Sequence, residues 1–318
     1  MTYTNTVTGT TPVGTNLNVK ERIKGLGAAA FWTLLFLGGM LFGALAVMLV
    51  GVYFDIDFVV DGIYAMNDFY VSIGTDGFGE AVEMLADKAA VFIHTTMCIG
   101  YLPVIVAMFI RRKEQGGFGE LKVSETSEVF KWVAISMAAS FVLDLLMQLA
   151  ATIPYFAEQA ATLSSVGVLS TAGLPWLALL TTGVLAPIVE EIAFRRGIQK
   201  AMTEKFNPVV GIATSALVFG VAHGNLFQGA FAALMGVILG YVYHKTGNLW
   251  YTTIIHIVNN SACVLISLLG LNSIVIGMAI PAIAALGYFA TRNACSNKAV
   301  AEAVAYLRAN YAAEKVEE

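Results

Sequence analysis

Apolar segments long enough to cross a lipid bilayer follow one another along most of this chain. Of its 318 residues, 58% are hydrophobic and 13% are charged, whereas a soluble domain carries about 25% charged residues. Because a helix needs about 20 mostly apolar residues to span a membrane, the sequence predicts an all-α polytopic membrane helix bundle. About eight transmembrane helices are expected, at 26–54, 88–110, 130–153, 173–203, 208–224, 228–243, 249–269 and 272–291.

The Lys and Arg residues are concentrated in alternate connections between these segments. They cluster before the first span, between the second and third, at the end of the fourth and after the eighth. The connections at 154–172, 225–227 and 270–271 contain none. Since cytoplasmic loops carry an excess of Lys and Arg, both termini are predicted to lie in the cytoplasm.

The same pattern divides the chain into four parts. Residues 1–24 begin with a stretch that has no apolar core and are expected to form a disordered cytoplasmic tail rather than a signal peptide. Residues 25–172 are expected to hold the N-terminal transmembrane helices, with an acidic external loop at 55–87 that we interpret as solvated rather than as a calcium site. Residues 173–291 form a second group of transmembrane helices, and 292–318 are expected to form a cytoplasmic C-terminal helix.

The cysteines and the charge distribution argue against several other classes of protein. Cys98, Cys263 and Cys295 lie far apart in the sequence and predict neither a disulfide framework nor a cysteine metal site. The sequence has no nucleic-acid-binding motif and no basic stripe. We therefore expect an integral membrane protein that contacts the lipid bilayer and no nucleic acid.

Six polar residues between 187 and 260 lie in or beside strongly apolar runs. They are Glu190, Glu191, Arg195, His223, His256 and Asn260. A charged side chain in hydrocarbon is so unfavourable that it usually faces a protein interior or a watery cavity and has a function there. A spacing of four residues places two side chains on the same helix face. Three pairs have this spacing: Glu191 and Arg195, Phe219 and His223, and His256 and Asn260.

The two adjacent acids are expected to have different roles. Glu191 shares a helix face with Arg195, which would hold it charged and structural. Glu190 lies about 140° from Arg195 around the helix, so it is expected to be unpaired and able to act as a base. Pro187 removes a backbone hydrogen bond and is expected to bend the helix just before the acids. The alternative is that both acids only cap a helix end beside basic residues.

The expected turn at Asn207–Pro208 brings the acids and His223 to one level. Glu191 and His223 are each 16 residues from residue 207. At about 1.5 Å per residue, both would lie roughly 24 Å from the turn. A lone histidine in an apolar helix is more often a core residue, but a second histidine and an acid pair in separate spans favour a shared site. The other two histidines, at 94 and 244, are left outside it.

These residues resemble the motifs of a known family. The pattern Glu190-Glu191-x-x-x-Arg195, then Phe219-x-x-x-His223, then His256-x-x-x-Asn260 is similar to the three motifs of the CPBP intramembrane endopeptidases. That family includes the CAAX prenyl endoproteases and the bacteriocin-processing and immunity (Abi) proteins. The resemblance covers about 175–265, and residues 194–197 are similar to the family's Phe-Arg-Gly continuation with one extra Arg.

The resemblance implies that 173–291 is a catalytic transmembrane core that hydrolyses a peptide bond inside the membrane. The expected substrate is a membrane-associated or lipid-modified peptide or protein. Glu190 would deprotonate a water molecule that His223 orients, and His256 and Asn260 would donate hydrogen bonds to the oxyanion. The Thr- and Gly-rich tail and the compact loops favour a bacterial cytoplasmic membrane.

The sequence leaves the cofactor and one rival function open. A zinc ion would accept His223, His256 and Glu190 as ligands, with water in the fourth position. Metal-free general-base catalysis by Glu190 fits the same residues, and we favour it slightly. The alternative function is a non-proteolytic binding, transport or scaffold protein that uses the same polar cavity.

Overall fold

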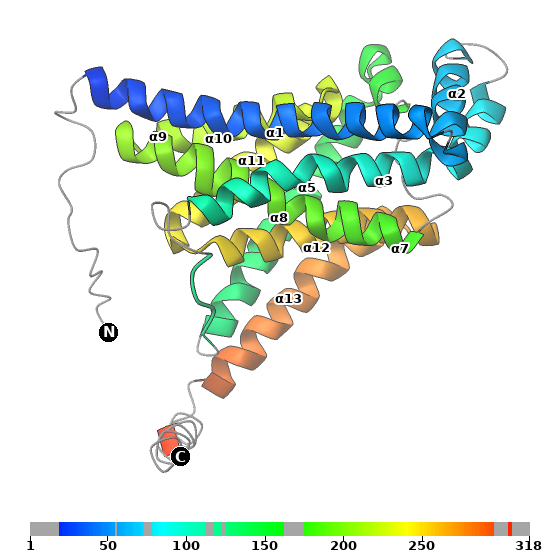
Figure 1. Cartoon of the computed structure of the whole chain (residues 1–318). Helices are drawn as coiled ribbons and strands as arrows, with labels where there is room; N and C mark the ends of the chain where they lie inside the picture. The colour runs from blue at the N-terminus through cyan, green and yellow to red at the C-terminus, as the bar shows by residue number, and fades with distance from the viewer. Residues whose placement is uncertain are drawn as a thin grey trace, which may run out of the picture.

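The computed structural model describes residues 19–54, 56–72, 78–111, 118–122, 125–161, 175–295 and 305–306 (Figure 1). Apart from turns and short connections, these residues are helical, which confirms the all-α prediction. The first 18 residues and most of the predicted C-terminal helix at 292–318 lie outside the described residues. Within them, the first helix starts at Val19, inside the part that was expected to be a tail.

Seven helices in the described part are long and apolar enough to cross a bilayer. Six are α1 (Val19–Tyr53), α3 (Phe78–Ile110), α5 (Thr126–Ala150), α11 (Leu226–Thr246), α12 (Leu249–Leu269) and α13 (Ser273–Cys295), and the seventh is the segment Pro175–Lys205. The predicted span at 208–224 is α10 (Pro208–Ala222), which has 15 residues. At about 1.5 Å per residue it extends about 22 Å, which is short of the roughly 30 Å hydrocarbon core. The chain is an integral membrane protein with seven membrane-length helices and one shorter apolar helix in its described part.

The predicted external loop at 55–87 is largely helical. It contains α2 (Asp57–Ser72), which packs against α3. Buried Val59 of α2 forms a small apolar cluster with Val47 and Phe92. The acidic residues of this stretch suggested a loop, but the apolar residues among them are enough to hold α2 against the bundle.

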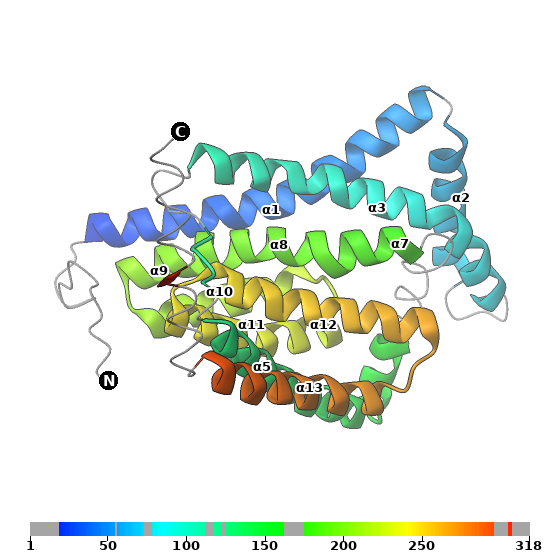
Figure 2. The same ribbon diagram turned by 90° about the horizontal axis from the view of Figure 1, so that it is seen from below.

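The segment from Pro175 to Lys205 lies in the middle of the bundle (Figure 2). It is one continuous helical rod that changes its winding, in the order α7 (Pro175–Ala178), π-helical η2 (Leu179–Leu185), α8 (Ala186–Glu190), π-helical η3 (Glu191–Gln199) and α9 (Lys200–Lys205). In Figure 2, α1 and α3 lie on one side of it and α12 on the other, with α5 and α13 beyond α12. The rod therefore has protein on both sides.

Close apolar packing fixes the position of this rod against α1. Trp32 is completely buried over Gly197, where an added Cβ atom would lie 2.4 Å from the indole Cγ. One helix turn further along α1, the Phe36 ring meets Phe194 edge-on at 5.0 Å between centroids. Burying large aromatic side chains of this kind contributes most of the packing energy in a core, so η3 is held firmly along its α1 side.

Three asparagines set the starts of the helices that face the rod. Asn207, Asn225 and Asn248 each have extended backbone and accept a hydrogen bond from a main-chain N–H of the first turn of α10, α11 and α12. Asparagine is among the best N-cap residues for this reason. Gly247 and Gly270 end α11 and α12 in the left-handed conformation that glycine adopts without strain. Asn and Gly residues at the helix ends thus determine where α10, α11 and α12 begin and where α11 and α12 end.

Candidate active site

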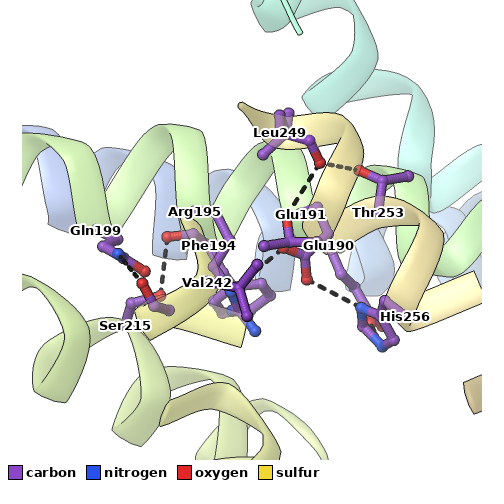
Figure 3. Close-up of polar contacts among 12 residues, drawn as sticks. Glu190, Glu191, Phe194, Arg195, Gln199, Ser215, Val242, Leu249, Thr253 and His256 are labelled. Carbon is purple, nitrogen blue, oxygen red and sulfur yellow. Dashed lines mark hydrogen bonds and ion pairs between the residues drawn. The ribbon is translucent and has the colours of Figure 1, made fainter. Parts of the chain in front are cut away.

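Glu191 forms a fully buried ion pair with Arg195, as the spacing of the two residues predicted. Neither side chain is exposed, and Arg195 Nε lies 3.3 Å from Glu191 Oε2. The guanidinium carbon lies 4.9 Å from the centre of the Phe219 ring, whose negative face attracts a cation. The pair sits at the start of η3, where the rod faces α12 and α10 (Figure 3). A buried carboxylate is thereby held charged and immobile.

His256 of α12 stands between the two acids. Its Nδ1 is 3.0 Å from Glu191 Oε1, and its Nε2 is 3.5 Å from Glu190 Oε2. Glu190 is therefore not isolated as the sequence suggested, because α12 brings the His256 ring within 3.5 Å of it from another part of the chain. A carboxylate oxygen can only accept a hydrogen bond, so the contact with Glu191 places a proton on Nδ1 of His256. In the neutral imidazole, Nε2 is then a lone-pair nitrogen directed at Glu190.

The exposure of the two acids differs, as their expected roles require. The Glu190 side chain retains 13% of its surface, whereas that of Glu191 retains none. Only Glu190 can reach a water molecule without rearrangement of the core. Its position at the junction of α8 and η3 separates it from the face on which Arg195 is held.

The turn before Pro187 is joined to α12 by hydrogen bonds that the sequence did not suggest. Asn260 Nδ2 donates to Thr182 O (3.3 Å), and Ser261 Oγ donates to Gly183 O (3.2 Å). Because a proline has no N–H, one carbonyl of this turn lacks a main-chain donor. Gly183 permits this approach, since a Cβ there would lie 2.9 Å from Ser261 Oγ. The turn that precedes the two acids is therefore also the turn that holds α12.

His223 ends α10, and its ring is oriented by the preceding turn. Its Nδ1 donates to the Phe219 carbonyl at 2.8 Å, because a carbonyl oxygen can only accept. The Phe219 ring meets the His223 ring edge-on at 4.8 Å and the His256 ring at 5.7 Å between centroids. Phe219 thus lies between the two histidines and under Arg195. The neutral His223 ring has an unprotonated Nε2.

A cavity of about 370 Å³ brings His223, His256 and Asn260 together. The remaining wall is mainly apolar, with Phe227, Phe231, Met235 and Leu239 among its residues. Ligand sites are typically concave and apolar with a few converging polar groups. The six predicted site residues thus lie in one region. His223, His256 and Asn260 line the cavity, while Glu190, Glu191 and Arg195 do not line it and are linked to it through His256.

The donor types in this region suit zinc, but their placement does not form a ligand set. Imidazole and carboxylate are ligands that zinc accepts, and a structural or catalytic zinc needs at least three of them from the protein. Among the residues that the structure describes, no three His, Cys, Asp or Glu side chains are grouped closely enough to hold a metal ion. The residues as arranged here do not fit the predicted zinc site.

Several residues that the sequence reasoning passed over contribute to this region. Ser140 of α5 donates to Asn259 Oδ1 at 2.7 Å, and Asn259 Nδ2 donates to Asn260 Oδ1 at 3.4 Å. The adjacency of Asn259 to the predicted Asn260 was the available signal. His94, which was left out, is buried against Thr181 Oγ1 at 2.6 Å, but Thr181 donates its proton to Leu177 O, so this pair is not an activated nucleophile.

Replacing Glu191 by Gln tests the buried ion pair. The change leaves the Arg195 charge buried without its partner, and it should lower the free energy of unfolding by roughly 3–5 kcal/mol. Thermal and denaturant unfolding of the purified protein in detergent measures it. The matched control is Glu204→Gln, which breaks the i,i+4 pair with partly exposed Lys200 and should cost about 1 kcal/mol or less. Equal losses in the two variants would contradict the structural role of Glu191.

Sequence comparisons show which known proteins this chain is similar to. Residues 172–262 match the family model for type II CAAX prenyl endopeptidase Rce1-like proteins. The putative membrane peptidase YdiL of Bacillus subtilis is 29% identical over 92 residues, which cover 29% of this chain and 38% of that protein. The membrane-embedded CAAX protease MroQ of Staphylococcus aureus is 24% identical over 192 residues, which cover 57% of this chain and 76% of that protein. No solved structure matches the chain at a significant level.

The matched residues are the ones that build the site. They start just before the rod and end in α12, two residues beyond Asn260. All six predicted site residues and the Phe219 ring lie inside this region. The part of this membrane protein that holds the paired acids, the two histidines and the amide is therefore the part that is similar to the Rce1-like CAAX prenyl endopeptidases.

Proposed function

We propose that this protein is an intramembrane endopeptidase that hydrolyses a peptide bond of a membrane-associated or lipid-modified peptide or protein. The observation that carries the proposal is a buried and oriented set of acid–base groups, in which Arg195 holds Glu191, both acids contact His256, and His256 lines an apolar cavity. A binding site for a metal cation would need several carboxylates directed into the cavity. Glu190 and Glu191 are both directed at His256 instead, which suits proton transfer.

Glu190 is assigned as the general base. Amide hydrolysis needs a water molecule to lose a proton as it attacks the carbonyl carbon, and a nearby carboxylate accelerates this step by about 10²–10⁴. Glu190 is the partly exposed acid, and once it has taken a proton from water it can donate a hydrogen bond to His256 Nε2, which lies 3.5 Å away. The proton taken from water can stay on Glu190 or pass toward His256 before it reaches the leaving amine.

The remaining residues orient and stabilise the reacting groups. Glu191, fixed by Arg195, keeps His256 in the tautomer whose Nε2 is directed at Glu190. His223, whose Nδ1 is used by the Phe219 carbonyl, offers Nε2 as an acceptor for the attacking water. Asn260 has an NH₂ group with two donors, of which the Thr182 carbonyl takes one. Its second N–H is available to an oxyanion formed in the cavity.

The arrangement supports the metal-free form of this mechanism. Glu190 and Glu191 both contact the same imidazole, and Glu191 also neutralises a buried guanidinium. A dication beside that guanidinium would be repelled by it. In this proposal the two histidines hold water and move protons, and the protein requires no zinc.

The orientation and division of the chain complete the proposal. The termini lie in the cytoplasm, 25–172 forms the N-terminal part of the bundle, and 173–291 forms the catalytic core. Bacterial relatives and the Lys and Arg distribution favour the cytoplasmic membrane of a bacterium. If α10 counts as a short eighth span, the even number of crossings returns the C-terminus to the side of the N-terminus.

Single-cysteine labelling tests this orientation. In a chain whose three native cysteines are replaced by Ser, Leu121→Cys should react with a membrane-impermeant maleimide only after cell lysis. Tyr155→Cys, beyond the other end of α5, should react in intact cells. Both native side chains are exposed, so failure of access is not expected. The reverse labelling pattern would overturn the cytoplasmic assignment.

Replacing Glu190 by Gln tests the activity. Gln keeps the shape and removes the base, so the protein should fold normally and lose about 10²–10⁴ in turnover. Comparative peptidomics of membranes from cells with wild type and Glu190→Gln should show peptides that only the wild type releases. Glu204→Gln is the matched control and should give the wild-type peptide pattern. A wild-type pattern from Glu190→Gln would instead support the non-proteolytic alternative.

Two further variants separate the metal-free from the zinc mechanism. Loss of an oxyanion donor reduces turnover by about 10²–10³, so Asn260→Ala should lower the cleavage rate. His256→Ala should lower it as well, because it removes the imidazole that contacts Glu190. Elemental analysis of the purified proteins should find no stoichiometric metal in the wild type or in either variant. Stoichiometric zinc in wild type that is absent from His256→Ala would contradict the metal-free mechanism.

A further inference from the structure

A carboxylate outside the family-matched region faces the candidate active-site cavity. Asp144 lies in α5 and lines both the 370 Å³ cavity and a neighbouring cavity of about 260 Å³. The two cavities share Asp144, Phe231, Asn259 and Cys263 as lining residues. They are therefore adjacent, and Asp144 stands where they meet.

Asp144 belongs to a polar stripe that runs along one face of α5. Ser136, Ser140, Asp144 and Gln148 follow one another at intervals of four, which is the spacing of one helix face. From Val133 to Ala150, Asp144 is the only charged residue of this helix. Ionisable residues at such positions usually face the bundle interior and mark a substrate pathway.

This stripe is hydrogen-bonded to the site. Ser140 donates to Asn259 Oδ1, Asn259 donates to Asn260 Oδ1, and Asn260 donates to the Thr182 carbonyl of η2. Asp144 therefore lies one turn of α5 from Ser140, the first residue of a series of hydrogen bonds that ends at the Pro175–Lys205 segment. Ser140 thus ties this face of α5 to the site, and Asp144 lines the cavity one turn further along.

The charge of Asp144 has no cationic partner among the described residues. Its Oδ2 accepts a hydrogen bond from Gln148 Nε2 at 2.7 Å, and no ion pair within the described part of the chain includes it. Among the residues described as lining the larger cavity, it is the one Asp, Glu, Lys or Arg. An apolar cavity wall with a single fixed negative charge favours a ligand that is apolar and carries a cation.

We infer that Asp144 determines specificity by binding a lysine or arginine side chain of the substrate within a few residues of the cleaved bond. This inference rests on the proposed peptidase function, because it names the class of peptide that the same cavity accepts. Asp144 touches the substrate side chain rather than the reacting atoms. The apolar wall receives the neighbouring residues of the peptide.

A defined peptide panel tests the inference. The probes are fluorogenic apolar peptides with acetylated and amidated ends, which carry Lys, Arg, norleucine or Glu at one position near the central bond. Blocked ends ensure that the tested side chain supplies the only charge. A hydrogen-bonded ion pair is worth about 10- to 100-fold in affinity, so wild type should prefer Lys over norleucine by about that factor in kcat/KM.

The variants assign this preference to one carboxylate. Asp144→Asn keeps the shape and the contact with Gln148, and it should bring the Lys-to-norleucine ratio close to one. Asp144→Glu keeps the charge and should retain the preference. Glu128→Gln removes a charge from the other end of α5, where Glu128 pairs with Lys131, and should leave the ratio as in wild type. A Lys preference that survives in Asp144→Asn would overturn the inference.

A binding measurement separates this inference from the peptidase proposal. Fluorescence anisotropy of the same peptides is measured with Glu190→Gln and with Glu190→Gln carrying Asp144→Asn. Tighter binding of the Lys peptide that Asp144→Asn removes supports the subsite, even if wild type cleaves none of the peptides and the proposed function fails. Equal binding of Lys and norleucine peptides to Glu190→Gln would overturn the subsite, whatever the cleavage results.

Discussion

The buried carboxylate of Glu191 is the group on which the site depends. It neutralises Arg195 inside the same segment and accepts a hydrogen bond from His256 of α12. A charge with no exposed surface is tolerated only where such partners compensate its lost hydration. The requirement to satisfy Glu191 therefore fixes the side chains of two helices relative to each other and sets the direction of the His256 ring.

The irregular winding around Pro187 makes this contact possible. Two π-helical segments flank the single regular turn that carries Glu190, and π-helical insertions are often found at functional sites. In the turn before Pro187, which lacks an N–H, the Thr182 and Gly183 carbonyls accept hydrogen bonds from Asn260 and Ser261 of α12.

The site also depends on helices that carry no family motif. Trp32 and Phe36 of α1 pack against the rod, and Asp144 of α5 lines the cavity. The region that matches the family model supplies the two acids, the two histidines and Asn260. The surrounding helices shape the space in which a substrate would lie.

The sequence by itself determined the class of fold, most helix positions and the six polar residues of the candidate site. Apolar length, Asn caps and the spacing of Glu191 and Arg195 are local properties, so they can be read along the chain. Three features depend on contacts between distant segments: His256 contacts both acids, Asn260 bonds the Thr182 carbonyl, and Asp144 lines the same cavity. Only the tertiary structure decided these, because buried polar groups take whichever partners the packing of other helices brings within hydrogen-bond distance.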